Sequence, residues 1–162
     1  MRSGLKKTKA PKAKPSSLVV ESYLRVSSDK VAGKSGSRIL APAKIIDQVQ
    51  VGLPIQELEA LRDSLDVPME KLASKLGISN ATLHRRKAQG RLGPAESDRV
   101  VRLARLIGKA AKVLGDIEAA RQWLNSPQFG LGGAVPLDYA ETEIGAREVE
   151  NLLGRIEYGV YS

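Results

Sequence analysis

The chain has 162 residues, a formal net charge of +8 and no cysteine. This length is enough for one ordinary domain or two small ones with a hydrophobic core. The lack of cysteine excludes disulfides, thiolate chemistry and zinc sites of the cysteine type, and it fits a reducing compartment. A single histidine and scattered carboxylates leave little material for nucleophilic catalysis, so the composition favours a binding protein over an enzyme.

The N-terminal region carries most of the net charge. Residues 1–17 contain six Lys or Arg and no Asp or Glu, among prolines and serines that favour disorder. Residues 18–45 add a short alternating piece and a Gly/Ser/Lys stretch, so we expect a basic, flexible region over 1–45. It either attracts phosphate non-specifically or is simply hydrated. Because no apolar run is long enough for a membrane span or a secretory signal, a cytoplasmic protein is expected.

Charge is unevenly divided along the rest of the chain. Residues 69–112 hold eleven Lys or Arg against three Asp or Glu, whereas residues 115–162 hold three against eight. Such a division is typical of a protein with two binding roles, one of them toward a polyanion. It is also compatible with two hydrated helical faces, so the local pattern has to decide.

Apolar spacing predicts three helices between residues 55 and 83. The first begins near Ile55, after Pro54, and ends at 66–68. In the second, Leu72 and Leu76 lie one turn apart, and the glycine that follows them suits a left-handed backbone. Ser79 is a good N-cap for the third helix. The pattern is therefore helix, tight turn, helix.

The stretch from Leu72 to Leu83 resembles the helix-turn-helix of the Xre and lambda-repressor class of DNA-binding proteins. In that arrangement the second helix enters the major groove, and nearby cations hold the phosphates. Arg86 departs from the pattern, which has an apolar residue at that position, so the set of base-reading residues stays open. The resemblance implies a DNA-binding set of Ser79, Asn80, Thr82, His84, Arg85, Arg86, Lys87 and Arg91.

Residues 84–87 could instead be a hydrated cationic helix end that favours the helix dipole. A second basic row on the next helix favours DNA binding, and it comprises Arg99, Arg102, Arg105, Lys109 and Lys112. That next helix is expected over about 96–114, with Ser97 as its cap. Its broad apolar face predicts burial on more than one side, either within one chain or in a homodimer.

The C-terminal part predicts a compact helical hairpin. A helix through Trp123 and Leu124 ends at 125–127, a glycine-rich loop spans 129–137, and a last helix starts near Thr142. The glycines form neither a dinucleotide fingerprint nor a P-loop, so they indicate positive φ angles and close backbone approach. One apolar face of the last helix is expected to comprise Ile144, Val149, Leu152, Leu153, Ile156 and Val160.

A family resemblance covers about residues 52–162. Its C-terminal part rests on Ala120, Trp123-Leu124, Pro127, Leu131-Gly132-Gly133, Pro136-Leu137, Thr142, Gly145, Val149, Leu152-Leu153, Ile156 and Gly159. These residues look like the toxin-binding domain of the Xre/MbcA/ParS antitoxin family. The resemblance implies an all-α fold, with an Xre-like helix-turn-helix bundle at 46–93, a connecting helix at 94–114 and a toxin-binding domain at 115–162.

The resemblance also implies a function. A type II antitoxin of this kind would bind double-stranded operator DNA to repress its own operon, as a homodimer at least in complex. It would neutralise a RES-domain toxin, an NAD-consuming enzyme, by blocking the toxin's active site, and it would need no cofactor or metal. The implied toxin-binding residues are Leu131, Gly132, Gly133, Leu137, Arg155, Tyr158, Tyr161 and Ser162.

Three alternatives remain open at this point. Tyr158 and Tyr161 could cap the core of the last helix, as we expect of Trp123. The protein could be an Xre-type transcriptional regulator whose C-terminal domain serves only dimerisation. It could also be an enzyme that uses the paired carboxylates Glu141 and Glu143, although acids at a helix start are usually cap or dipole partners.

Overall fold

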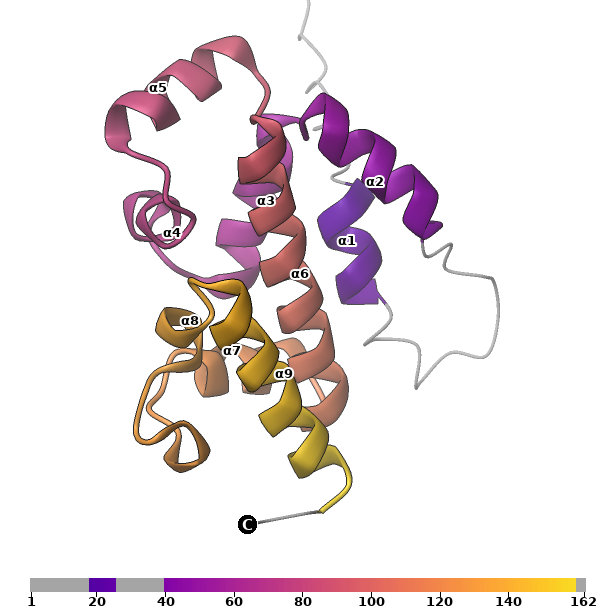
Figure 1. Ribbon diagram of the computed structural model, residues 1–162, viewed down its shortest axis with the longest axis vertical. Coiled ribbons are helices and arrows are strands. Elements are labelled where there is room, and N and C mark those ends of the chain that lie inside the picture. The colour runs from indigo at the N-terminus through magenta and orange to yellow at the C-terminus, as the bar shows by residue number, and fades with distance from the viewer. Residues whose placement is uncertain (1–17, 26–39, 160–162) are drawn as a thin grey trace, which may run out of the picture.

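The computed structural model describes residues 18–25 and 40–159, and the regular structure in these two ranges is helical, as expected (Figure 1). One isolated antiparallel bridge joins Pro54 to Arg91. The α-helices are α1 (Leu18–Arg25), α2 (Pro42–Val51), α3 (Ile55–Leu65), α4 (Met69–Lys75), α5 (Asn80–Gln89), α6 (Pro94–Leu114), α7 (Ile117–Leu124), α8 (Pro136–Tyr139) and α9 (Glu143–Glu157). A short 3₁₀ helix, η1 (Phe129–Leu131), lies between α7 and α8.

Helix α6 forms the centre of the fold. It packs against α1, α2 and α3 from the N-terminal part and against α7 and α9 from the C-terminal part (Figure 1). Its wide apolar face is therefore buried within one chain, which was the simpler of the two sequence-based interpretations. The residues that fill this face are Val100, Leu103, Ala104, Leu106, Ile107, Ala110 and Ala111.

The start of α6 differs from the prediction. The helix begins at Pro94, because Gly93 is the N-cap and Glu96 Oε2 accepts a 2.7 Å hydrogen bond from the Gly93 backbone N–H. Ser97 is fully buried and caps nothing. Its hydroxyl donates to Gly93 O at 2.7 Å and accepts from Leu53 N at 2.8 Å, so it ties α6 to the loop between α2 and α3.

The expectation of weak structure over 18–45 is wrong for residues 18–25 and 42–45, which are helical. Val19 and Val20 are 0% exposed, and their backbone N–H groups both donate to the buried carboxylate of Glu57 at 3.0 Å. This carboxylate satisfies two N–H groups that a helix start leaves without partners. Glu57 on α3 thus caps the start of α1. The spacing of residues within α1 could not predict this interaction, because Glu57 is far away in the sequence. Residues 1–17 and 26–39 lie outside the described ranges.

The C-terminal hairpin is closed by side-chain caps and one close backbone contact. Asp116 accepts from Ala119 N at 2.7 Å and starts α7, and Thr142 accepts from Gly145 N at 3.0 Å and starts α9. A Cβ atom on Gly145 would lie 1.6 Å from the Tyr139 carbonyl oxygen. Only glycine permits this approach of α8 to α9.

The buried face of α9 differs from the predicted one at its first residue. Gly145, Ala146, Val149 and Leu153 are buried, whereas Ile144 is 79% exposed. At 3.6 residues per turn, residues 145, 149 and 153 follow one line down the helix, and residue 144 lies about 100° away from it. Val160, which was also placed on this face, lies outside the described residues.

Candidate functional sites

The predicted helix-turn-helix is present as α4, a turn and α5. Gly77 has a φ of +67°, and the Ile78 backbone N–H donates to Ala73 O at 2.8 Å, which closes the end of α4. Leu72, Ala73, Ile78 and Leu83 are buried, so the turn packs on the core as the spacing predicts. The Ser79 hydroxyl accepts from Thr82 N at 3.2 Å and caps α5.

Helix α5 presents most of the predicted DNA-binding side chains to solvent. Ser79, Asn80, His84, Arg85 and Lys87 are exposed, and Thr82 is half-buried. Leu83 is the residue of α5 that is buried, so the helix rests on the core along one narrow line. Figure 1 shows α5 at one end of the molecule, far from the C-terminal end of α9.

Arg86 is engaged within the protein. Its Nε lies 2.9 Å from Glu96 Oε2, the carboxylate that also caps α6, and the two side chains are 23% and 13% exposed. A methyl group on Gly93 would come within 2.7 Å of Arg86 Nη2. Arg86 therefore occupies the place of the apolar residue that the helix-turn-helix pattern calls for, and Glu96 neutralises its charge there.

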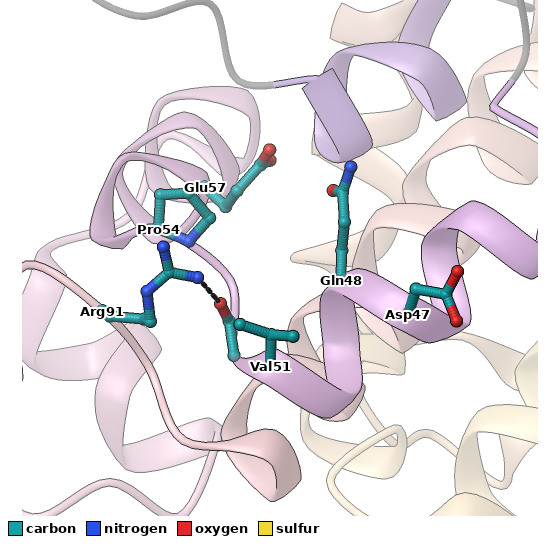
Figure 2. A pocket seen from close by; sticks show the side chains of 7 residues that line it. Asp47, Gln48, Val51, Pro54, Glu57 and Arg91 are labelled. Carbon is teal, nitrogen blue, oxygen red and sulfur yellow. Dashed lines mark hydrogen bonds between the residues drawn. The ribbon is translucent and has the colours of Figure 1, made fainter.

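Arg91 also makes a contact inside the fold. Its Nη1 donates to Gly52 O at 2.6 Å, which joins the end of the α5 segment to the start of the α2–α3 loop (Figure 2). The guanidinium forms part of the wall of a cavity of about 380 Å³. The cavity is lined by Asp47, Gln48, Val51, Gly52, Pro54, Glu57 and Arg91.

The second basic row, which the sequence reading assigned to DNA binding, faces the rest of the protein along part of its length. Arg99 Nη1 donates to Leu76 O at 2.8 Å and so braces the turn of the helix-turn-helix. Arg102 Nε lies 2.9 Å from Glu143 Oε2, and Arg105 Nε lies 2.9 Å from Glu150 Oε1. Three of the five cations of this row, which were expected to favour DNA binding, therefore have partners within the fold.

Opposite charges join the two halves at a further point. Lys75, at the end of α4, forms ion pairs with Asp138 and with Glu141, and its side chain is 8% exposed. Glu141 and Glu143 thus have different cationic partners, Lys75 and Arg102, rather than acting as a carboxylate pair. Some of the cations of the first half therefore pair with carboxylates of the second half.

The predicted toxin-binding residues divide into surface and core. Gly132 and Gly133 are exposed with φ angles of +66° and +87°, in agreement with the predicted positive φ. Tyr158 is 79% exposed at the end of α9, which excludes a role as a cap of this chain's core, and Arg155 is half-buried. Leu131 is partly buried and Leu137 is 1% exposed, so Leu137 packs the loop from inside. Tyr161 and Ser162 lie outside the described residues.

Phe129 was not among the predicted site residues. It is 99% exposed at the start of η1, whereas Trp123 packs partly buried against the core, as expected. One signal was available in the sequence: no charged residue occurs between Gln122 and Leu137 in a chain that is 27% charged. Glu57 gave no such signal, because its role depends on α1.

Two structural findings bear on other function classes. Within residues 18–25 and 40–159, no group of three or more His, Cys, Asp or Glu side chains is arranged to hold a metal ion. In the same ranges, no helix has both the length and the apolar character needed to cross a membrane.

Two family models match the chain. The Antitoxin Xre-like helix-turn-helix domain matches residues 44–105, and the Antitoxin Xre/MbcA/ParS C-terminal toxin-binding domain matches residues 109–159. The first match begins inside α2, contains α3 to α5 and extends to residue 105 of α6, and the second contains the end of α6 and α7 to α9.

Curated relatives resemble the chain over most of its length. Antitoxin Xre of Yersinia enterocolitica is 33% identical over 120 residues, which cover 73% of this chain and 81% of the relative. Antitoxin Xre of Photorhabdus laumondii is 33% identical over 113 residues, which cover 68% and 76%. A Sphingobium protein named Prs ADP-ribosylating antitoxin is 25% identical over 132 residues, which cover 75% and 83%. The chain belongs to the Xre/MbcA/ParS family of type II antitoxins, which are not enzymes, and it combines a DNA-binding helix-turn-helix with a toxin-binding domain.

Proposed function

We propose that the chain neutralises an NAD-consuming RES-domain toxin by covering its active site, and that it represses its own operon through the helix-turn-helix. The match of residues 109–159 to a toxin-binding domain carries the first part. The name of the Sphingobium relative, which includes ADP-ribosylation, supports a toxin that consumes NAD.

The proposed toxin surface lies at the end of the molecule that contains η1 and the end of α9. Exposed glycine backbone at 132 and 133 lets a partner approach closely, and the Tyr158 ring has an apolar face and a polar tip for a pocket. The contact set is Leu131, Gly132, Gly133, Arg155 and Tyr158, continued by Tyr161 and Ser162. Leu137 supports this set from the core.

The proposed DNA surface is the exposed side of α5. Asn80 and Arg85 have the donors and acceptors that read adenine and guanine in the major groove, while Lys87 is suited to a phosphate. His84, Ser79 and Thr82 complete the surface. The engagement of Arg86 with Glu96, and of Arg91 with Gly52, makes these two arginines supports of the surface rather than its main readers.

The domain limits follow this division of roles. Residues 46–93 form the DNA-binding domain, 94–114 the connecting helix and 115–162 the toxin-binding domain, after the basic region at 1–45. We place the protein in the cytoplasm, where operator DNA is accessible, and we propose that it binds a palindromic operator as a homodimer.

Co-expression with a RES-domain toxin tests the neutralising role. We expect the two proteins to purify together and NAD consumption by the toxin to fall when the antitoxin is added. An Xre-type regulator without a toxin partner would leave NAD consumption unchanged.

Titration of the duplex upstream of the gene tests the DNA-binding role. We expect the logarithm of the affinity to fall linearly with the logarithm of salt concentration, and we expect the affinity to exceed that for an unrelated duplex of equal length. Equal affinity for the two duplexes would contradict operator recognition.

A further inference from the structure

Phe129 is the most exposed large apolar side chain in the described part of the chain, and it stands on a rigid support. Gln128 O accepts from Leu131 N at 3.1 Å and from Gly133 N at 2.9 Å. The Gln128 side-chain amide donates to Trp123 O at 3.0 Å and to Ser126 O at 3.1 Å. These bonds fix the backbone on both sides of the phenyl ring.

The turn that carries Phe129, η1, also packs against α9. A methyl group on Gly130 would come within 2.6 Å of Leu152 Cδ1, so η1 lies directly against α9. Phe129 itself gains nothing from this packing, because its ring is 99% exposed. The backbone thus holds an exposed apolar ring at a defined position. A Phe side chain has only two torsion angles, so it loses little conformational entropy when a partner covers it.

The chain segment that carries the ring lacks charge. No Lys, Arg, Asp or Glu occurs from Gln122 to Leu137, although many of these residues are on the surface. The exposed ones are Gln122, Asn125, Ser126, Pro127, Phe129, Gly130, Gly132 and Gly133. A single exposed apolar residue needs no explanation, but an aromatic ring inside an uncharged exposed patch has the composition of an interface core.

We propose that Phe129 is the apolar anchor of the toxin interface and that it fills an uncharged pocket on the toxin. This inference rests on the proposed function and adds to it a second contact point beside the end of α9. The toxin is the favoured occupant because residues 109–159 match a toxin-binding domain and the uncharged patch lies within that match. A second copy of this chain is the competing occupant.

The test compares Phe129→Ala with Ile144→Ala. Both side chains are apolar and strongly exposed in the same domain, so both variants should fold like the parent protein. The probe is the RES-domain toxin of that co-purification, separated from the parent complex in denaturant and refolded, with binding measured by calorimetry. Phe129→Ala should weaken binding by about 30-fold or more, the loss typical of an interface anchor. Ile144→Ala should bind like the parent, and Phe129→Leu should retain most of the affinity.

Each other result overturns the assignment. Equal affinity of Phe129→Ala and the parent protein would exclude the ring from the interface. A loss of self-association in sedimentation, with toxin binding unchanged, would assign the patch to a second copy. Failure of the parent protein to bind the toxin would instead remove the proposed function, and a parent titration run first separates the two cases.

Discussion

The two ends of the molecule present different chemistry on similar helical supports. At the α5 end, His84, Arg85 and Lys87 are exposed on the second half of a helix, whereas at the η1 end Phe129 is exposed within a segment that has no charged residue. Cations suit a polyanion and an uncharged aromatic patch suits a protein partner. The two ends therefore differ in surface charge, although α6 packs against both halves of one shared core.

Between the two ends, charge has a structural role. The pairs of Arg102 with Glu143 and of Arg105 with Glu150 join α6 to α9, and Lys75 joins α4 to the segment around α8. One partner in each pair is largely open to solvent, so each pair contributes about 0 to 1 kcal/mol and the shared apolar core supplies most of the cohesion. The ion pairs still fix which faces of the two halves meet.

Gly145→Ala should destabilise the C-terminal hairpin, and it has the largest expected effect. The added Cβ would meet the Tyr139 carbonyl oxygen at 1.6 Å, so we expect a loss of about 3 kcal/mol in the free energy of unfolding. Gly154→Ala on the same helix is the control, because its nearest atom is Lys109 Nζ at 4.0 Å. That variant should gain about 0.5 to 1 kcal/mol from helix propensity. Urea denaturation measures both, and equal stabilities would refute the close contact.

Arg85→Ala should lower operator affinity without an effect on toxin binding. The side chain is exposed on α5, and loss of a bidentate base contact costs about 1 to 3 kcal/mol of operator affinity. Arg147→Ala, which removes the same charge from an exposed position on α9, should leave operator affinity nearly unchanged. Fluorescence anisotropy with a labelled operator duplex measures both. Equal losses in the two variants would mean that overall charge, and not α5, determines binding.

Arg86→Ala should lower stability more than it lowers operator affinity. It leaves the partly buried Glu96 without its cationic partner, and we expect a loss of about 1 to 2 kcal/mol in the free energy of unfolding. Arg85→Ala, one residue away, should change stability by less than about 0.5 kcal/mol. Urea denaturation measures the stability of the two variants. A larger loss of stability in Arg85→Ala than in Arg86→Ala would contradict a stabilising role of the Arg86–Glu96 pair.

Lys87→Ala should have the smallest effect. A lost phosphate contact reduces the slope of log affinity against log salt by about 1, with little change in preference between operator and unrelated DNA. Titrations at several salt concentrations measure the slope. An unchanged slope would place Lys87 away from the phosphates.

Periodic and capping patterns were enough to predict the helix-turn-helix. Gly77, Ser79 and the apolar spacing of Leu72 and Leu83 are local features, and each has the role that its residue type suggests. Helix α1 could not be found in this way, because its start depends on Glu57, which is far away in the sequence. The partners of Arg86, Arg99 and Arg102 could not be predicted for the same reason, because they are also distant in the sequence.

The helical class, the turn between α4 and α5 and the two unlike halves follow from spacing, caps and composition in the sequence, whereas the family follows from the resemblance of particular motifs to its members. The tertiary structure decided which cations are free and which apolar side chains face water. Arg86 and Arg105 carry the same charge as Arg85, and Ile144 is as apolar as Val149, so residue type cannot separate them. Only the packing of α6 against both halves gives each of these side chains a partner or leaves it exposed.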